Sequence, residues 1–226
     1  KLLGGRVDPP AFNLRNDLMV AKHVHATVIT RLHQYTRDDS RTAAERERIG
    51  GVVKSCLPRL VSRFLFDDAN NVRTAVFDFT PLDQLIKANR DDLVAYVAKA
   101  FHQGWPAKDA EVTTLEALRA HVEGTVSGLI ELVGRLRRRL KWAMAQMARL
   151  NRVREQQGAL EPADDALFKR CDRLVKRLKG TDARGRREAE GYDDVNTFGV
   201  LAAECFLPGY GLEVGSVLGT AEIPFW

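Results

Sequence analysis

The residues with the clearest chemical potential are the basic side chains of the run RLRRRLK at positions 135–141. Arginine and lysine bind phosphate groups without reading a base sequence. A second basic group follows further along the chain, so two cationic rows are available to one polyanion. The candidate DNA-binding residues are Arg135, Arg137, Arg138, Arg139, Lys141, Lys169, Arg173, Lys176 and Arg177.

The charge of the chain is concentrated around these residues. The whole chain has 35 Lys and Arg against 30 Asp and Glu, a net charge of +5. Residues 135–190 hold 17 basic and 8 acidic residues, so this segment carries +9 and the remainder −4. Such polarisation favours a polyanionic partner, and nucleic acid is the commonest one. The alternative is an ordinary solvated helix face whose cations pair with neighbouring acids, although acids are few here.

No pattern in the chain predicts a catalytic centre or a bound cofactor. The sequence contains no GxxxxGK[ST], HExxH or GxSxG motif and no HxK pair. Adjacent acids such as Asp67 and Asp68 point about 100° apart on a helix, so they cannot share one metal or one proton. His23 and His25 diverge in the same way. We expect them in the core or in an interface, with contact to a nucleic-acid backbone as the alternative.

The cysteines and the hydropathy pattern suggest the compartment. Cys56, Cys171 and Cys205 form no CxxC pair, and their odd number argues against a disulfide framework. A reducing cytoplasm is therefore expected. The chain has no run of about 18 apolar residues and no charged-then-apolar leader, so we expect neither a membrane partner nor secretion.

The elements that must position the basic residues are helices. Apolar residues at helical spacing predict helices from Asn16 to about residue 37, over about 42–66 with a kink at Pro58, and from a hydroxyl cap at Thr80 to Gly104. A capping box at Thr113 and Glu116 predicts a long helix over 115–157.

A short turn then leads into a further helix with its own apolar stripe. The two helices are expected to fold back antiparallel as a basic hairpin over about 114–179. The predicted fold is mainly α: a helical bundle with a long antiparallel helical hairpin and short β segments at the C-terminal end.

We predict three parts in the chain. Residues 1–40 form a linker and a first helix, and residues 41–190 form the helical bundle with the hairpin. Residues 191–226 form a helix, a turn and the start of a β-containing domain, because glycine and β-branched residues are frequent from Val214 onward. Both ends are expected to be cut, which makes the chain a piece of a longer protein.

Two stretches near the ends of the chain resemble a known family. Residues 9–26 read PPAFNLRNDLMVAKHVHA, and residues 192–211 read YDDVNTFGVLAAECFLPGYG. They are similar to the patterns PPRxDLxNxxLVRSHVHA and YRYLAxEGFLPGYxFP of large bacterial superfamily-two DNA helicases, the DrmA type of DISARM phage defence and its MrfA/YprA-like relatives. Residues 197–199, TFG, replace the family's usual Tyr-Arg-Tyr, as expected of a divergent branch.

The resemblance implies that the chain is the region after the second motor domain of such a helicase. ATP and Mg would then belong to the parent motor, so this chain would carry no cofactor and no catalytic residue of its own. Its partners would be DNA, the motor domains of the same parent and a subunit of a defence complex. The alternative is a protein-interaction scaffold that docks a partner subunit of a defence or repair complex and does not touch DNA.

Overall fold

The computed structural model describes residues 15–104, 111–180 and 196–209. Within these ranges the chain is mainly helical, as predicted, and its only β pairings are two isolated bridges, Leu60 with Asn196 and Phe66 with Val72. The β segments predicted from Val214 onward lie outside the described residues. The elements are α1 (Asp17–Tyr35), α2 (Ala43–Cys56), α3 (Ser62–Leu65), α4 (Thr80–Ala88), α5 (Arg90–Gly104), the 3₁₀ helix η1 (Glu111–Thr113), α6 (Leu115–Glu123), α7 (Thr125–Gln157), α8 (Pro162–Lys179) and α9 (Thr197–Ala203).

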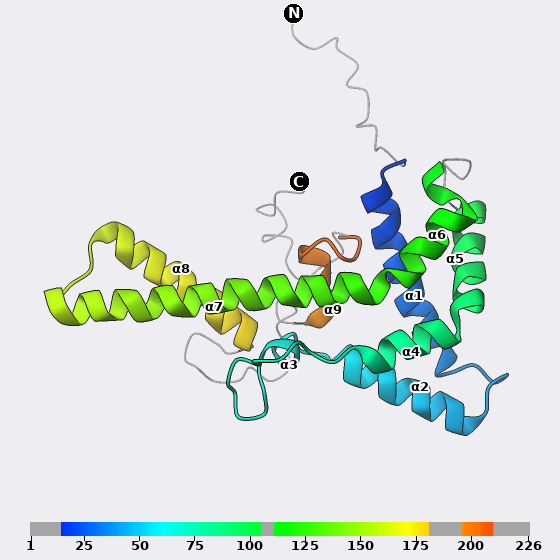
Figure 1. The fold of residues 1–226 in the computed structure, drawn as a ribbon, viewed down its shortest axis with the longest axis horizontal. Helices are drawn as coiled ribbons and strands as arrows, with labels where there is room; N and C mark the ends of the chain where they lie inside the picture. Colours follow the sequence, from blue (N-terminus) through cyan, green and yellow to red (C-terminus); the bar gives the residue numbers. More distant parts are fainter. Residues whose placement is uncertain (1–14, 105–110, 181–195, 210–226) are drawn as a thin grey trace, which may run out of the picture.

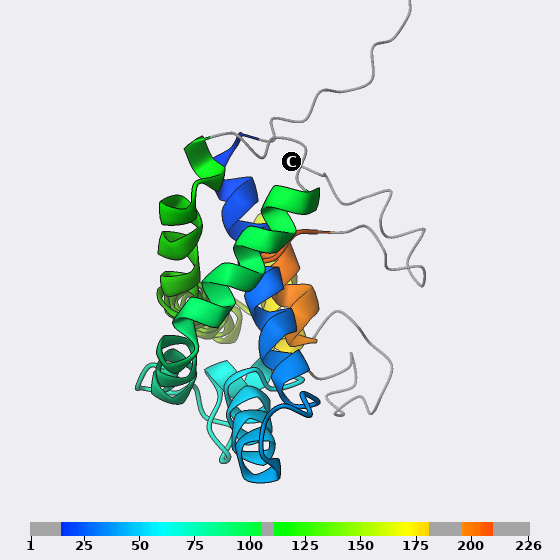
Figure 2. The ribbon, with the colours of Figure 1, turned by 90° about the vertical axis from the view of Figure 1, so that its right-hand side faces the viewer.

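Helix α1 lies at the centre of a helical body and contacts α2, α5 and α6. It begins as predicted, because the Asn16 side chain accepts hydrogen bonds from the first free backbone N–H groups. The stripe predicted for this helix is Ala21, Val24, Val28 and Leu32. The last three are buried in a core shared by most of the other helices, and Ala21 is half-buried. Figure 2 shows α9 beside α1, so a segment from the far end of the chain completes the body.

Helix α7 leaves this body and extends well beyond it, with α8 packed along its length (Figure 1). Leu136 and Leu140 of α7 and Cys171 and Val175 of α8 are buried. Helix α7 ends at Gly158, whose φ of 79° is a left-handed conformation that glycine adopts without strain. None of the described helices combines the length and the apolar character needed to cross a membrane.

The long helix predicted over 115–157 is in fact two helices. Gly124 ends α6 and precedes α7, which lets α6 pack on α1 and α5 while α7 takes a different direction. The predicted capping box is also wrong. The N-cap is Thr114, whose hydroxyl accepts from Ala117 N–H, so the third helical position holds alanine and no carboxylate.

Two other predicted helices are also interrupted. Pro58 does not kink a helix over 42–66 but ends it: α2 stops at Cys56, because proline disfavours helical geometry in the residue before it. Asn89 separates α4 from α5 and donates its amide to the Leu85 carbonyl at 2.9 Å. Thr80 is the first residue of α4 rather than its cap. The N-cap residue is Phe79, and the Asp78 carboxylate accepts from the Thr80 backbone N–H at 2.9 Å.

Candidate nucleic-acid interface

The net positive charge lies on α7 and α8. Residues 125–180 contain fourteen Lys and Arg against six Asp and Glu, a net charge of +8. The described body before them, residues 15–104 and 111–124, contains fifteen against fourteen. Because the projecting pair of helices is strongly cationic and the body is nearly neutral, a polyanion is attracted to the pair.

The basic run of α7 does not form one row, because successive residues of a helix point about 100° apart. Three of its arginines make contacts within the chain. Arg135 is paired with Glu131 on the same helix at 2.9 Å, and Arg137 donates to the Thr74 carbonyl at 3.1 Å. Arg139 forms an ion pair with Glu204, just after α9. The contacts of Arg137 and Arg139 hold α7 against the loop before α4 and against the end of α9.

Four cations lie along the exposed side of α7. Arg138, Lys141, Arg149 and Arg152 are exposed and follow one another at steps of three, eight and three residues, with Ala145 in the gap. We call these four residues the outer row. The row spans about 21 Å at about 1.5 Å per residue, roughly the axial length of six phosphates of one DNA strand.

The residues of the outer row differ in how far they are engaged inside the protein. Arg138 and Lys141 make no ion pair within the described residues, whereas Arg149 lies 3.7 Å from Asp164. Arg149 and Arg152 are not among the residues predicted from the sequence, because they lie outside the contiguous basic run at 135–141. The helical spacing of residues from Arg138 onward is the signal that includes both.

The four predicted cations of α8 fall into two pairs. Lys169 and Lys176 are each 2.7 Å from the acid four residues before them, Asp165 and Asp172. Arg173 and Arg177 are exposed. Ion pairs of this kind contribute little to stability, so their lysines can exchange the carboxylate for a phosphate. Since α7 and α8 bury their apolar faces against each other, their outer faces point apart.

His25 takes part in an internal contact and does not face solvent as a phosphate ligand. Its ring stacks on Phe206 with centroids 4.2 Å apart, and its Nδ1 donates to the Phe206 carbonyl at 3.1 Å. Burial lowers the pKa of His25 to about 4; the hydrogen bond opposes this shift and nearby His121 adds to it. Burial, followed by Lys22, also lowers the pKa of His23. The contact brings together the two stretches that carry the family resemblance.

A polar cluster joins α1 to α5. Arg31 donates to both oxygens of Asp92, at 3.0 and 3.2 Å, and the buried Tyr35 hydroxyl donates to the same carboxylate. The guanidinium of Arg31 lies 4.9 Å from the ring centres of both Tyr35 and Tyr96. Burial, and then the bond to Asp92, raise the pKa of Tyr35. These groups satisfy one another, so the cluster stabilises the fold.

The described residues include no group of three or more His, Cys, Asp or Glu side chains that is placed to hold a metal ion. Trp105 precedes Pro106 in the sequence, which predicts a packing role with base stacking as the alternative, and it lies outside the described residues. No protein-family model matches the chain, and no curated protein or solved structure matches it either. The interpretation of function therefore depends on the charged surface of α7 and α8 and on the resemblance of the two terminal stretches.

Proposed function

We propose that this chain is an accessory DNA-binding and scaffolding region of an ATP-dependent DNA helicase, of the superfamily-two type that it resembles, in bacterial anti-phage defence. The motor of the parent protein would hydrolyse ATP with Mg, and this region would hold or guide the DNA. The observation that carries the proposal is the separation of charge: +8 on residues 125–180, beside a body with nearly equal numbers of basic and acidic residues.

Within this surface, the outer row of α7 is the best supported phosphate contact. Its members are exposed on one face of the helix, and two of them, Arg138 and Lys141, have no ion pair to break among the described residues. The cations of α8 are the second contact. Because the outer faces of the two helices point apart, one straight duplex cannot lie along both, so α8 would bind a bent or separate segment.

The test is a salt titration of DNA binding by the full chain. Labelled duplex and single-stranded oligonucleotides of unrelated sequence are titrated by fluorescence anisotropy at several salt concentrations. We expect weak binding without sequence preference and with a steep salt dependence. Arg138→Glu, Lys141→Glu and Arg149→Glu together should lower the slope of log Kd against log salt by about three for duplex DNA.

A matched triple variant separates local contacts from net charge. Arg48→Glu, Lys99→Glu and Arg119→Glu make the same change in charge at exposed positions of the body, on α2, α5 and α6. These substitutions should leave most of the binding intact. Binding that ignores salt, or that both triple variants weaken equally, would contradict the proposal.

The second candidate function is a scaffold that docks a partner subunit through the same helices without touching DNA. The observation that favours it is the exposure of apolar side chains among the cations of α7: Trp142 is 53 % and Met144 38 % exposed. A protein partner would bury such groups. Capture of a defence-complex subunit that needs Arg138 and Trp142, together with no shift of labelled DNA, would favour this function over the first.

A further inference from the structure

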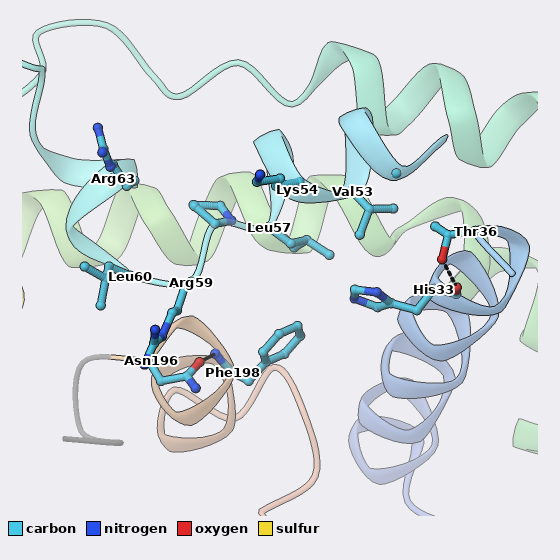
Figure 3. A pocket seen from close by; sticks show the side chains of 12 residues that line it. His33, Thr36, Val53, Lys54, Leu57, Arg59, Leu60, Arg63, Asn196 and Phe198 are labelled. Atoms are coloured by element: carbon cyan, nitrogen blue, oxygen red, sulfur yellow. Dashed lines mark hydrogen bonds between the residues drawn. The ribbon is translucent and has the colours of Figure 1, made fainter. Parts of the chain in front are cut away.

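A groove lies on the body of the protein, and one of its walls includes Arg63 of α3, a helix that packs against α7 and α8. It runs between the end of α1, α2, the segment after α2 and the start of α9, and its volume is about 700 Å³ (Figure 3). It is lined by His33, Thr36, Gly50, Val53, Lys54, Leu57, Pro58, Arg59, Leu60, Arg63, Asn196 and Phe198. We call it the α1–α2–α9 groove.

The groove has an apolar surface that the described residues leave uncovered. Leu60 is 38 % and Phe198 37 % exposed, and both are among the few large apolar side chains of the described chain with such exposure. Val53 and Leu57, which belong to the buried core, also line the groove. The rings of His33 and Phe198 lie close together with centroids 6.4 Å apart and planes tilted by 53° (Figure 3). Contact between apolar surface and water costs free energy, and a bound apolar group would remove that cost.

The charged residues that line the groove are all basic. Lys54, Arg59 and Arg63 are exposed, and no Asp or Glu side chain is among the lining residues. Arg63 is 3.1 Å from Asp68, an ion pair with both partners exposed. Lys54 and Arg59 make no ion pair within the described part of the chain. A neighbouring hollow shares His33, Thr36 and Phe198 and adds Arg37, again with no acidic residue.

We propose that the α1–α2–α9 groove binds an acidic peptide segment of a partner protein, in which an apolar or aromatic side chain is flanked by Asp or Glu. The anchor would cover Leu60 and Phe198, and the flanking carboxylates would pair with Lys54 and Arg59. Charge complementarity and the apolar surface of Leu60 and Phe198 favour this occupant over DNA. A sugar–phosphate backbone would pair with the cations but leave that apolar surface uncovered.

The experiment starts from a probe of unbiased composition. A random twelve-residue peptide library displayed on phage is selected on the full chain, and the most enriched peptide is synthesised with a fluorescent label for anisotropy. We expect enriched sequences that combine Phe, Trp or Leu with Asp and Glu. Lys54→Glu with Arg59→Glu should weaken binding of that peptide about tenfold, since reversal replaces two attractions with repulsions.

Two further variants test whether a loss of peptide binding is specific to the groove rather than a result of misfolding. Phe198→Ser removes the anchor contact without changing charge and should also weaken binding. Lys99→Glu, an exposed substitution on α5 with no place in the groove, should not. Selection of neutral or basic peptides, no enrichment, or equal binding by wild type and groove variants would overturn the proposal. Binding of single-stranded oligothymidine to the groove, lost in the same variants, would overturn it in favour of DNA.

This inference does not depend on the proposed function. Reversal of Arg138, Lys141 and Arg149 should weaken DNA binding and leave peptide binding unchanged. Reversal of Lys54 and Arg59 should weaken peptide binding about tenfold and leave DNA binding unchanged. Each proposal can therefore fail while the other holds.

Discussion

The stability of the protein should fall in mild acid because of His25. Its pKa is about 4 in the folded chain against 6.5 in its ordinary range. Above pH 6.5 the ring is neutral in both states and no stability is lost. As pH falls from 6.5 toward 4, the unfolded chain takes up the proton first, so unfolding becomes more favourable; below 4 the loss levels off. Between about pH 7.5 and about pH 5 the expected loss is about 2 kcal/mol.

Urea unfolding at these two pH values, followed by circular dichroism, measures this difference. Two substitutions remove the titration in different ways. His25→Phe keeps a ring to stack on Phe206, and His25→Asn keeps a donor for the Phe206 carbonyl. At neutral pH the free energy of unfolding of each variant should be about 1 to 2 kcal/mol lower than that of the wild type. On acidification each variant should lose less stability than the wild type does. If both variants show the wild-type pH dependence, the assignment of the titration to His25 is refuted.

Three further predictions concern packing and backbone geometry. Asp92→Ala leaves the buried Tyr35 hydroxyl without an acceptor and should cost about 2 kcal/mol of unfolding free energy, whereas Asp91→Ala beside it should cost under about 1 kcal/mol. Leu150 is fully buried yet lies outside the continuous core. Leu150→Ala should therefore speed amide hydrogen exchange in α7 and α8 where they project farthest from the body, while exchange in the body stays slow. Equal acceleration in both parts would contradict this. Gly158→Ala forces a side chain into a left-handed conformation and should lower stability by about 1 kcal/mol, and an unchanged urea midpoint would contradict the strain.

Helical periodicity is enough to predict the helical class and the buried stripe of α1. Apolar residues that share one face of a helix are removed from water only when that face packs against other elements. Helix ends were predicted less well. The capping box of α2, in which Thr42 and Glu45 satisfy each other's backbone N–H groups, was present in the sequence and overlooked. At Thr113 the same kind of pattern was predicted, yet the helix begins one residue later. A local pattern cannot by itself decide between neighbouring start positions, because packing of the following residues determines the register.

The candidate interface was found by charge alone, and its geometry required the structure. Nothing in the basic run shows that Arg137 reaches the Thr74 carbonyl or that Arg139 pairs with Glu204. The first two residues are separated by 63 positions in the sequence and the second two by 65 positions. The α1–α2–α9 groove could not be predicted for the same reason. His33, Leu60 and Phe198 come from three distant segments and become neighbours only after folding.

The contact between His25 and Phe206 also bears on how the chain reaches its native state. The two residues are 181 positions apart in the sequence, so closing the chain between them costs conformational entropy. The ring of Phe206 also lies close to Gly128 of α7, where an added Cβ would come within 3.1 Å of it, so its contact surface is complete only when α1 and α7 are both in place. A nascent chain that has not yet been synthesised as far as Phe206 leaves this apolar surface unfilled, and exposed apolar surface of this kind favours aggregation and chaperone binding.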